Sequence, residues 1–294
     1  MADEEAPEVT PLPILHEESH FMVIDKPVGL FTQAAPGIES VQTRLTEQIK
    51  QRDQHVGVPF VGLPHRLDRG TSGVILIARN QRALSRFGEQ FHSRKVGKYY
   101  LVAVVGQLVT ESQEQSSNSP TLPPAIMSPT LPPAEWSDYI RKVSDQPMAE
   151  ICEAAAEGAK LAQLIAEPLA TAGGVTLLLI KLLTGRMHQI RIQAASRGLR
   201  ILGDLTYGGP EFFDIQNEFD VESNGQEYSG EGELASMALH ALRLEIRHPQ
   251  TAKQMAFTAA PPSTWENLPR ELRRAAAECV DRSRRDNYIA WGLK

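Results

Sequence analysis

The stretch HRLDRGTSG, which runs from His65 to Gly73, is followed directly by the apolar run Val74–Ile77. The glycines predict a turn, and the apolar run predicts a buried strand. The stretch places the carboxylate of Asp68 between the guanidinium groups of Arg66 and Arg69. A carboxylate held by neighbouring cations stays ionised at neutral pH and can act as a nucleophile or a base. Arginines beside it can bind phosphate or stack on a nucleobase.

A purely structural interpretation of the same stretch is also open. Asp68 could cap backbone amides of the turn, which is a common task of aspartate before glycine. An isolated Asp-x-Gly turn would favour this structural interpretation. The whole nine-residue stretch HRLDRGTSG, with an arginine on each side of Asp68, favours the chemical one.

Two more stretches carry side chains suited to chemistry. Lys98-Tyr99-Tyr100 opens an apolar run that ends at Gly106, and alternation along a strand allows only one of the two tyrosines to face a given side. Further on, Leu182–Gln193 reads LLTGRMHQIRIQ, and a helix is expected from about Met187 to Arg197. Helical spacing would place His188, Arg191 and Ala195 on one side, and Ile190, Ala194 and Arg197 on another.

Together these stretches resemble the motifs of the RluA-type pseudouridine synthases, which isomerise uridine to pseudouridine within RNA. Lys98–Tyr100 is similar to the family's Lys-x-Tyr block, and Leu182–Gln193 to its Thr-Gly-Arg-x-His-Gln-Ile/Leu-Arg block. Weaker similarities follow at Arg200–Gly208, at Leu239–Leu242 and at His248-Pro249, so the resemblance covers roughly residues 14–262. The sequence departs from the family's pattern at two places. Phe31-Thr32-Gln33 stands where the family often has a histidine-bearing segment, and there is no room before Ile14 for the N-terminal RNA-binding module that many members carry.

The resemblance implies roles for individual residues. Asp68 would act on the ribose, Tyr100 would lie against the target base, and Arg191 would pair with Asp68. Arg66 would fill or brace the space that the extruded uridine leaves. Arg186, beside a glycine at a helix N-terminus, is a candidate for phosphate contact. The expected RNA-binding residues are His65, Arg66, Arg69, Arg186 and Ile190, while His188 and Gln189 are expected to have hydrogen-bonded structural roles.

Two other functions remain open at this point. A carboxylate beside a sugar could hydrolyse an N-glycosidic bond, although glycosidases usually use two carboxylates and the matching blocks offer no clear second one. A non-catalytic RNA-binding protein could also use this fold, but Asp68, Tyr100 and Arg191 are all intact. No cofactor and no metal are expected, since the two cysteines and the scattered histidines lack ligand spacing and no P-loop or dinucleotide fingerprint is present.

The net charge of -6 argues at first against an RNA partner, but the charge is unevenly distributed. His65–Lys98 holds eight Lys or Arg against two acids, and Lys181–Arg200 holds five Arg or Lys and no acid. Glu211–Glu233 holds eight acids and no base. The positive charge therefore falls on the segments that carry the motifs, which is a usable footprint for RNA.

The expected fold class is α+β, with a mixed, largely antiparallel central sheet flanked by helices and loops. Residues 1–11 are expected to be a disordered tail and 12–262 the catalytic domain, with a flexible Ser/Pro-rich insertion at 107–135 and an acidic loop at 211–233. Residues 263–294 are expected to form a charged helical tail packed through Trp265, Leu268 and Leu272. A cytoplasmic monomer is expected, with no membrane association and no required protein partner.

Particular elements are expected as well. Two short strands with a turn at Glu17–Ser19 should occupy Ile14–Pro27, and Ser40 and Asn80 should each cap a helix. Further strands are expected at residues 98–106, 139–143, 161–165, 175–183, 239–246 and 255–257.

Overall fold

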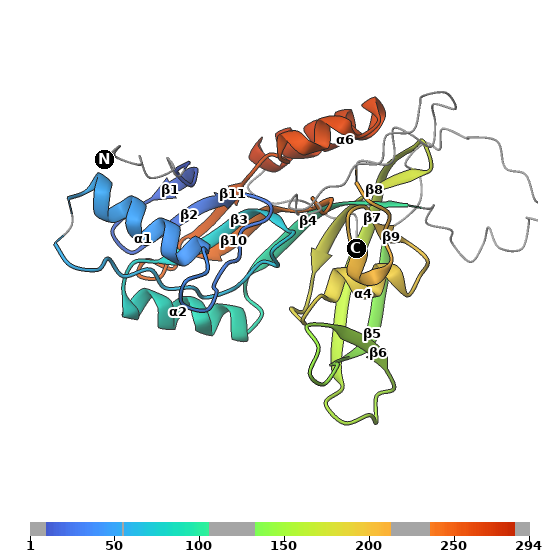
Figure 1. Cartoon of the computed structure of the whole chain (residues 1–294), viewed down its shortest axis with the longest axis horizontal. Coiled ribbons are helices and arrows are strands. Elements are labelled where there is room, and N and C mark those ends of the chain that lie inside the picture. The colour runs from blue at the N-terminus through green and yellow to red at the C-terminus, as the bar shows by residue number, and fades with distance from the viewer. Residues whose placement is uncertain (1–9, 55, 106–132, 213–235, 286–294) are drawn as a thin grey trace, which may run out of the picture.

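The structure is a computed structural model, and it describes residues 10–54, 56–105, 133–212 and 236–285. One mixed sheet of eleven strands runs through this part of the chain in the order β1-β2-β3-β10-β4-β8-β7-β5-β6, with β11 beside β10 and β9 beside β4 (Figure 1). The strands are β1 (Ile14–Glu17), β2 (Phe21–Lys26), β3 (Ser72–Ala78), β4 (Gly97–Val105), β5 (Ala134–Lys142), β6 (Ala149–Cys152), β7 (Lys160–Ala172), β8 (Val175–Leu182), β9 (Arg200–Ile201), β10 (Leu239–Arg247) and β11 (Gln254–Thr258). The helices are α1 (Val41–Arg52), α2 (Gln81–His92), α4 (Gln189–Ala195) and α6 (Arg270–Arg285), with 3-10 turns η1 (Leu205–Tyr207) and η2 (Ser263–Asn267).

Strand β10 joins the two halves of this sheet. It pairs in parallel with β3 through His240 and Ala241, and antiparallel with β4 along most of its length. Among the described strands the β3–β10 pair is the only parallel one. The predicted α+β class with a largely antiparallel sheet is therefore confirmed.

The N-terminal half places one helix on each face of β2 and β3. Residues of β2 alternate, so that Met22 and Ile24 pack under α1, whereas Phe21 and Val23 pack under α2. The predicted caps are both present: Ser40 accepts from the backbone N–H of residue 43, and the Asn80 side chain accepts from that of residue 83. A side-chain cap satisfies a backbone donor that the helix itself leaves free, which fixes where each helix begins.

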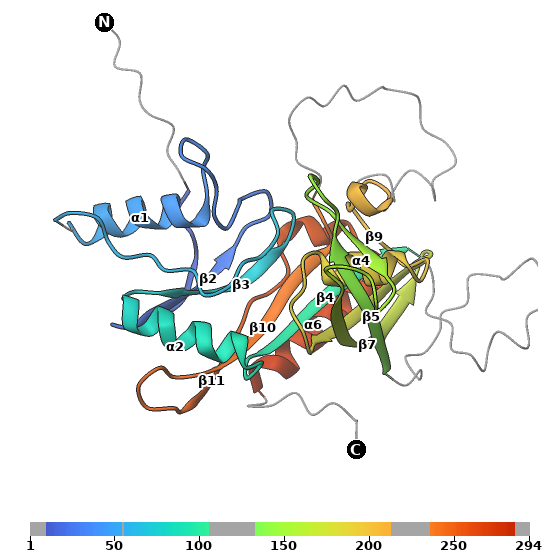
Figure 2. The same ribbon diagram turned by 90° about the horizontal axis from the view of Figure 1, so that it is seen from below.

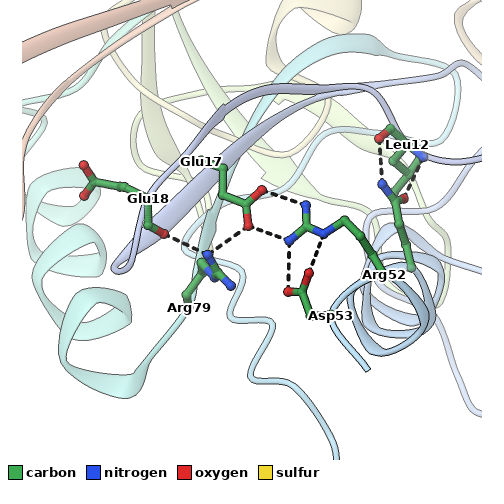
Figure 3. A network of polar contacts seen from close by, with 7 residues as sticks. Leu12, Glu17, Glu18, Arg52, Asp53 and Arg79 are labelled. Carbon is green, nitrogen blue, oxygen red and sulfur yellow. Dashed lines mark hydrogen bonds and ion pairs between the residues drawn. The ribbon is translucent and has the colours of Figure 1, made fainter. Parts of the chain in front are cut away.

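A polar network ties the C-terminal end of α1 to the edge of the sheet (Figure 3). Arg52 donates two hydrogen bonds of 2.7 Å to the carboxylate of Glu17 in β1, and two more to Asp53. Arg79 also donates to Glu17, at 2.9 Å, from the end of β3. Each of these pairs is partly exposed and adds little stability alone. As a network they fix the orientation of α1, whose buried face helps to position the loop that follows β2.

The C-terminal half carries α4 on one face and α6 on the other, which Figure 2 shows from below. Ile190 and Ala194 of α4 pack on Leu178 and Ile180 of β8, while Leu272 and Ala276 of α6 pack against the opposite face. The helix expected from Ser263 is divided in two, because Pro269 forces an extended conformation at Leu268 and α6 begins only after it. Trp265, Leu268 and Leu272 are nevertheless all buried, as expected.

Several boundaries and elements differ from those predicted. The predicted insertion 107–135 lies outside the described residues except for its last three, and Ala134 already pairs with Ala166 at the start of β5. Strand β7 continues to Ala172 rather than ending at 165, since Pro168 sits at a bulge where its missing N–H costs no ladder bond. Strand β6 was not predicted. The predicted acidic loop 211–233 lies outside the described residues beyond Phe212, and so does most of the predicted tail 1–11.

A further difference concerns the helix after Gly185, which spans Gln189–Ala195 rather than 187–197. His188 precedes it in the left-handed conformation, with φ 50°, so it cannot be part of the helix. The shortened helix begins directly beside the loop that carries Asp68, as shown below.

We predict that Gly73→Ala strongly destabilises the protein. Gly73 has φ +106°, and a Cβ placed there would lie 2.3 Å from the carbonyl oxygen of Ala241 in β10. Because this neighbour is backbone of the β3–β10 pair, which joins the two halves of the sheet, we expect a loss of at least ~2 kcal/mol. Urea unfolding followed by circular dichroism measures it.

Gly88→Ala is the matched control. Gly88 lies within α2 and a Cβ there would meet nothing within 4 Å, so alanine should stabilise the helix by about 0.5–1 kcal/mol. Equal unfolding midpoints for the two variants would contradict the packing described for Gly73.

Candidate active site

The loop that carries Asp68 is held by hydrogen bonds to its backbone. The Thr32 hydroxyl donates to the carbonyl of Leu67 at 2.7 Å and accepts from its N–H at 3.1 Å. The N–H of Thr71 donates to the carbonyl of Asp68, and the N–H of Gly29 donates to that of Arg69. The backbone around Asp68 is thus fixed independently of its side chain, which leaves the carboxylate free for chemistry.

Lys26 fixes the same loop from below. Its side chain is fully buried, and its ammonium donates to the carbonyl oxygens of Pro27, Arg69 and Thr71 at 2.8–3.2 Å. Burial lowers the pKa of Lys26 to about 7, while the negative charge of Asp68 opposes this shift. The ammonium therefore bridges the end of β2 to both sides of the Asp68 turn.

Two side chains of the β8–α4 segment approach the carboxylate of Asp68. Nη1 of Arg191 lies 3.5 Å from Oδ2, and Nε2 of His188 lies 3.9 Å from the same oxygen. The side chain of Asp68 keeps 36% of its surface exposed. The structure therefore brings Asp68 and Arg191 together, as expected, with an open side through which a substrate can reach the carboxylate.

The stronger partner of Arg191 is Asp204, which follows β9. Nε and Nη2 of Arg191 donate to the two oxygens of Asp204 at 2.7 and 2.6 Å, and the Asp204 side chain is almost fully buried. The guanidinium also lies over the ring of Tyr207, 5.0 Å from its centroid. Burial opposes the charge of Arg191, but its bonds to Asp204 and the nearby Asp68 raise its pKa. Arg191 is thus held by one carboxylate and presented to another.

His188 is linked to the same group of residues. Its Nδ1 lies 3.0 Å from the hydroxyl of Tyr207, which also accepts from the N–H of Ala149 in β6 and lies 3.2 Å from its carbonyl oxygen. Burial lowers the pKa of His188, Asp68 opposes the shift, and Arg191 adds to it. The ring is therefore neutral at neutral pH, and its bond to Tyr207 fixes its direction toward Asp68.

Tyr100 lies where the two halves of the sheet meet. Its ring packs against the core under α1 and also against the core under α4. Burial and the charge of Asp68 raise its pKa, so the phenol stays protonated. Tyr99 points to the opposite face, where its hydroxyl donates to Glu245 at 3.2 Å. The alternation expected from the sequence thus places Tyr100, and not Tyr99, on the side of Asp68.

The five expected RNA-binding residues differ in their surroundings. Arg66 is exposed, and Arg69 is exposed with its guanidinium 4.7 Å above the Phe31 ring. Arg186 donates through Nε to the carbonyl of Leu161, which leaves its Nη groups available.

His65 and Ile190 have structural surroundings. The Nε2 atom of His65 accepts from the N–H of Leu76, and its ring stacks on Phe91 at 4.6 Å. The side chain of Ile190 is 4% exposed and packs in the core under α4, so it has no surface to offer to RNA. We therefore assign both side chains to packing, contrary to the expectation from the sequence.

Sequence reasoning missed Asp204 and Tyr207 as members of the site. Both lie in the stretch Arg200–Gly208, which was recognised only as a weak similarity. The sequence offers no clear signal for either residue, because an aspartate in a loop is usually exposed and this stretch also carries Arg200 and Thr206. The hydrogen-bonded role expected for Gln189 is present, since its side chain accepts from Thr184 and from the N–H of Arg186.

In the described ranges, no group of three His, Cys, Asp or Glu is arranged to hold a metal ion. None of the helices seen in those ranges has the length and apolar character needed to span a membrane.

Comparison with known proteins places this geometry in a family. The profile of the RNA pseudouridylate synthase family matches residues 20–196, which include Asp68, Tyr100 and Arg191. The chain belongs to this family. It is therefore an isomerase that acts on RNA, and the function expected from the sequence is confirmed at this level.

Curated relatives agree over most of their length. Ribosomal large subunit pseudouridine synthase D of Xanthomonas campestris pv. campestris is 30% identical over 283 residues, which cover 95% of this chain and 75% of the relative. An uncharacterized RNA pseudouridine synthase of Aquifex aeolicus is 31% identical, with 89% of this chain and 73% of the relative covered. Ribosomal large subunit pseudouridine synthase C of Vibrio parahaemolyticus is 27% identical, with 89% and 70% covered.

A solved structure supports the fold. The human RNA pseudouridylate synthase domain containing 1 superposes with a TM-score of 0.59 at 20% sequence identity, covering 96% of this chain and 98% of that one. At this identity the likeness concerns the arrangement of strands and helices only.

The two carboxylates that share Arg191 should differ in their effect on stability. Asp204→Asn breaks a buried bidentate pair and leaves the guanidinium partly uncompensated, so we expect a loss of about 3 kcal/mol. Asp68→Asn removes a longer, partly exposed contact and should cost under about 1 kcal/mol. Urea unfolding of both variants measures the difference, and a larger loss for Asp68→Asn would refute the assignment of Asp204 as the main partner.

Proposed function

We propose that this enzyme isomerises a uridine of large-subunit ribosomal RNA, with Asp68 as the catalytic residue. The observation that carries the proposal is the partly exposed carboxylate of Asp68 between Arg191 and His188, on a loop whose backbone is fixed by Lys26 and Thr32. The choice of RNA is supported by relatives that are named for the large ribosomal subunit.

The target uridine has to leave its stack before an enzyme can act on it. Arg66, exposed and two residues before Asp68, is suited to brace the vacated space. Tyr100 offers a ring on the Asp68 side of the sheet for the extruded uracil to stack against.

Asp68 then acts on the ribose, either by attacking the anomeric carbon or by removing a sugar proton. The bond between that carbon and N1 of uracil breaks, the ring turns, and a bond forms to C5. The C5 proton leaves and N1 is protonated, so the RNA keeps its mass and no redox or phosphoryl transfer is required. Arg191, anchored by Asp204, holds the carboxylate of Asp68 in place throughout.

Hydrolysis is the less favoured outcome on structural grounds. Glycosidases use two carboxylates, one of them as a proton donor. Arg191 joins Asp68 to one further carboxylate, that of Asp204, and both oxygens of Asp204 are occupied by Arg191 in a buried pair. Asp204 is thus poorly placed to activate water or protonate a leaving group.

Asp68→Asn should abolish pseudouridine formation while leaving the fold intact. The measurement is tritium release from large-subunit ribosomal RNA transcribed in vitro with uridine labelled at C5, with transfer RNA prepared in the same way as a second substrate. Asp145→Asn is the control, because Asp145 is an exposed acid in the turn between β5 and β6. Undiminished release by Asp68→Asn would remove Asp68 from the chemistry.

The product and the site distinguish the remaining outcomes. Isomerisation leaves no free uracil, whereas hydrolysis releases it, and a non-catalytic protein gives neither product. Mapping pseudouridines in cellular RNA with and without the gene identifies the target. A missing pseudouridine in transfer RNA, with ribosomal RNA unchanged, would overturn the proposed substrate.

A further inference from the structure

Lys98 is a partly buried lysine close to the site that the chemistry above does not use. It lies in β4 two residues before Tyr100, so both side chains leave the same face of the strand, about 7 Å apart. Its ammonium donates to the carbonyl of Thr184 at 3.3 Å. A Cβ at Gly185 would approach this ammonium to 3.2 Å, so the glycine leaves the room in which Lys98 lies.

The charges around Lys98 are positive. Burial and, to a smaller extent, the guanidinium groups of Arg186 and Arg94 together lower the pKa of Lys98 to about 8. Arg186 follows Gly185 directly, and Arg94 lies in the turn between α2 and β4. Asp68 is not among the charges that shift Lys98, although it affects Lys26 and Tyr100. The three cations thus form a group separate from the Asp68–Arg191 pair.

None of these three cations pairs with a carboxylate in the part of the chain that the structure describes. This sets them apart from many other cations of the fold. The arginines that do have carboxylate partners are Arg44, Arg52, Arg79, Arg141, Arg191, Arg197, Arg243 and Arg274. A partly buried ammonium whose charged neighbours are cations costs stability, because one carbonyl partner does not neutralise its charge. Stability therefore does not explain the group.

An anion would explain it. Lys98 has two ammonium protons beyond the one given to Thr184, and Arg186 has free Nη groups beyond the Nε bonded to Leu161. Cationic donors of this kind bind phosphate through short, charge-assisted hydrogen bonds. The spacing from Tyr100 is comparable to that between the base of a nucleotide and its own phosphate.

We propose that Lys98 and Arg186 form a binding site for one backbone phosphate of the RNA, next to the nucleotide that stacks on Tyr100, with Arg94 adding positive charge from the turn before β4. This inference rests on the proposed function, since it takes RNA as the ligand and Tyr100 as the base contact. To the phosphate contact expected for Arg186 it adds Lys98 as a second donor and a position for that phosphate beside Tyr100. The site holds the strand while the base is turned, so it contributes to RNA binding rather than to bond breaking.

The test is the salt dependence of RNA binding by Lys98→Met. The probe is a fluorescein-labelled RNA hairpin with a uridine-rich loop, titrated at several KCl concentrations in the Asp68→Asn background, where turnover does not interfere. Loss of one phosphate contact should reduce the slope of log affinity against log salt by about 0.7. Affinity at 0.1 M salt should fall about tenfold, as expected for one charge-assisted bond.

Two variants serve as controls. Lys253→Met removes an exposed lysine in the turn between β10 and β11 and should leave slope and affinity unchanged. Lys98→Arg keeps the charge and should retain the slope that Lys98→Met loses. Equal losses in Lys98→Arg and Lys98→Met would indicate packing and overturn the proposal, and so would a wild-type slope for Lys98→Met.

Kinetics and stability give independent readouts. With Asp68 intact, Lys98→Met should raise KM and leave kcat within about twofold, because uniform binding energy affects KM. A loss confined to kcat would overturn the proposal. Thermal unfolding of Lys98→Met should show no loss of Tm, and if this variant fails to fold, Arg186→Gln is tested for the same change in slope. Since binding is measured without turnover, failure to find pseudouridine would leave this result interpretable.

Discussion

The ion pair between Arg191 and Asp204 is the interaction on which the rest of the site depends. Because Asp204 takes two short hydrogen bonds in a buried position, the guanidinium cannot rotate toward solvent, and its remaining Nη1 is left facing Asp68. A single arginine thus serves a structural carboxylate and a reactive one at the same time. Tyr207, beneath the guanidinium and bonded to His188, extends this rigidity to the second group that faces Asp68.

This arrangement is possible because the site lies between two halves of one sheet. The loop of Asp68 belongs to the half that carries α1 and α2, whereas Arg191, His188 and Asp204 belong to the half that carries α4. Tyr100 contacts the cores of both. The cation of Arg191 on one half therefore meets the carboxylate of Asp68 on the other, and neither half contains the whole site.

The sequence was sufficient for features that depend on local pattern. The caps at Ser40 and Asn80, the alternation that separates Tyr99 from Tyr100, and the turn at Asp68 all follow from neighbouring residues. The bidentate pair with Asp204 could not be predicted, because it joins residues through a loop whose path is set by tertiary contacts. The length of β7 and the late start of α4 could not be predicted for a similar reason. Strand β7 continues because the sheet accommodates a bulge at Pro168, and α4 starts late because His188 adopts the left-handed conformation.

The position of β10 has a consequence for the order of folding. Strand β10 pairs with β3 and β4, although more than a hundred residues separate it from either strand in the sequence. Such long-range pairing is slow to form and carries a loop-closure cost. During synthesis, one edge of β3 and one edge of β4 consequently stay unpaired until β10 has been made. The two halves are joined only after residues 239–247 have been synthesised. Catalytic competence is therefore acquired late in translation, and of the described strands only β11 has still to join the sheet after β10.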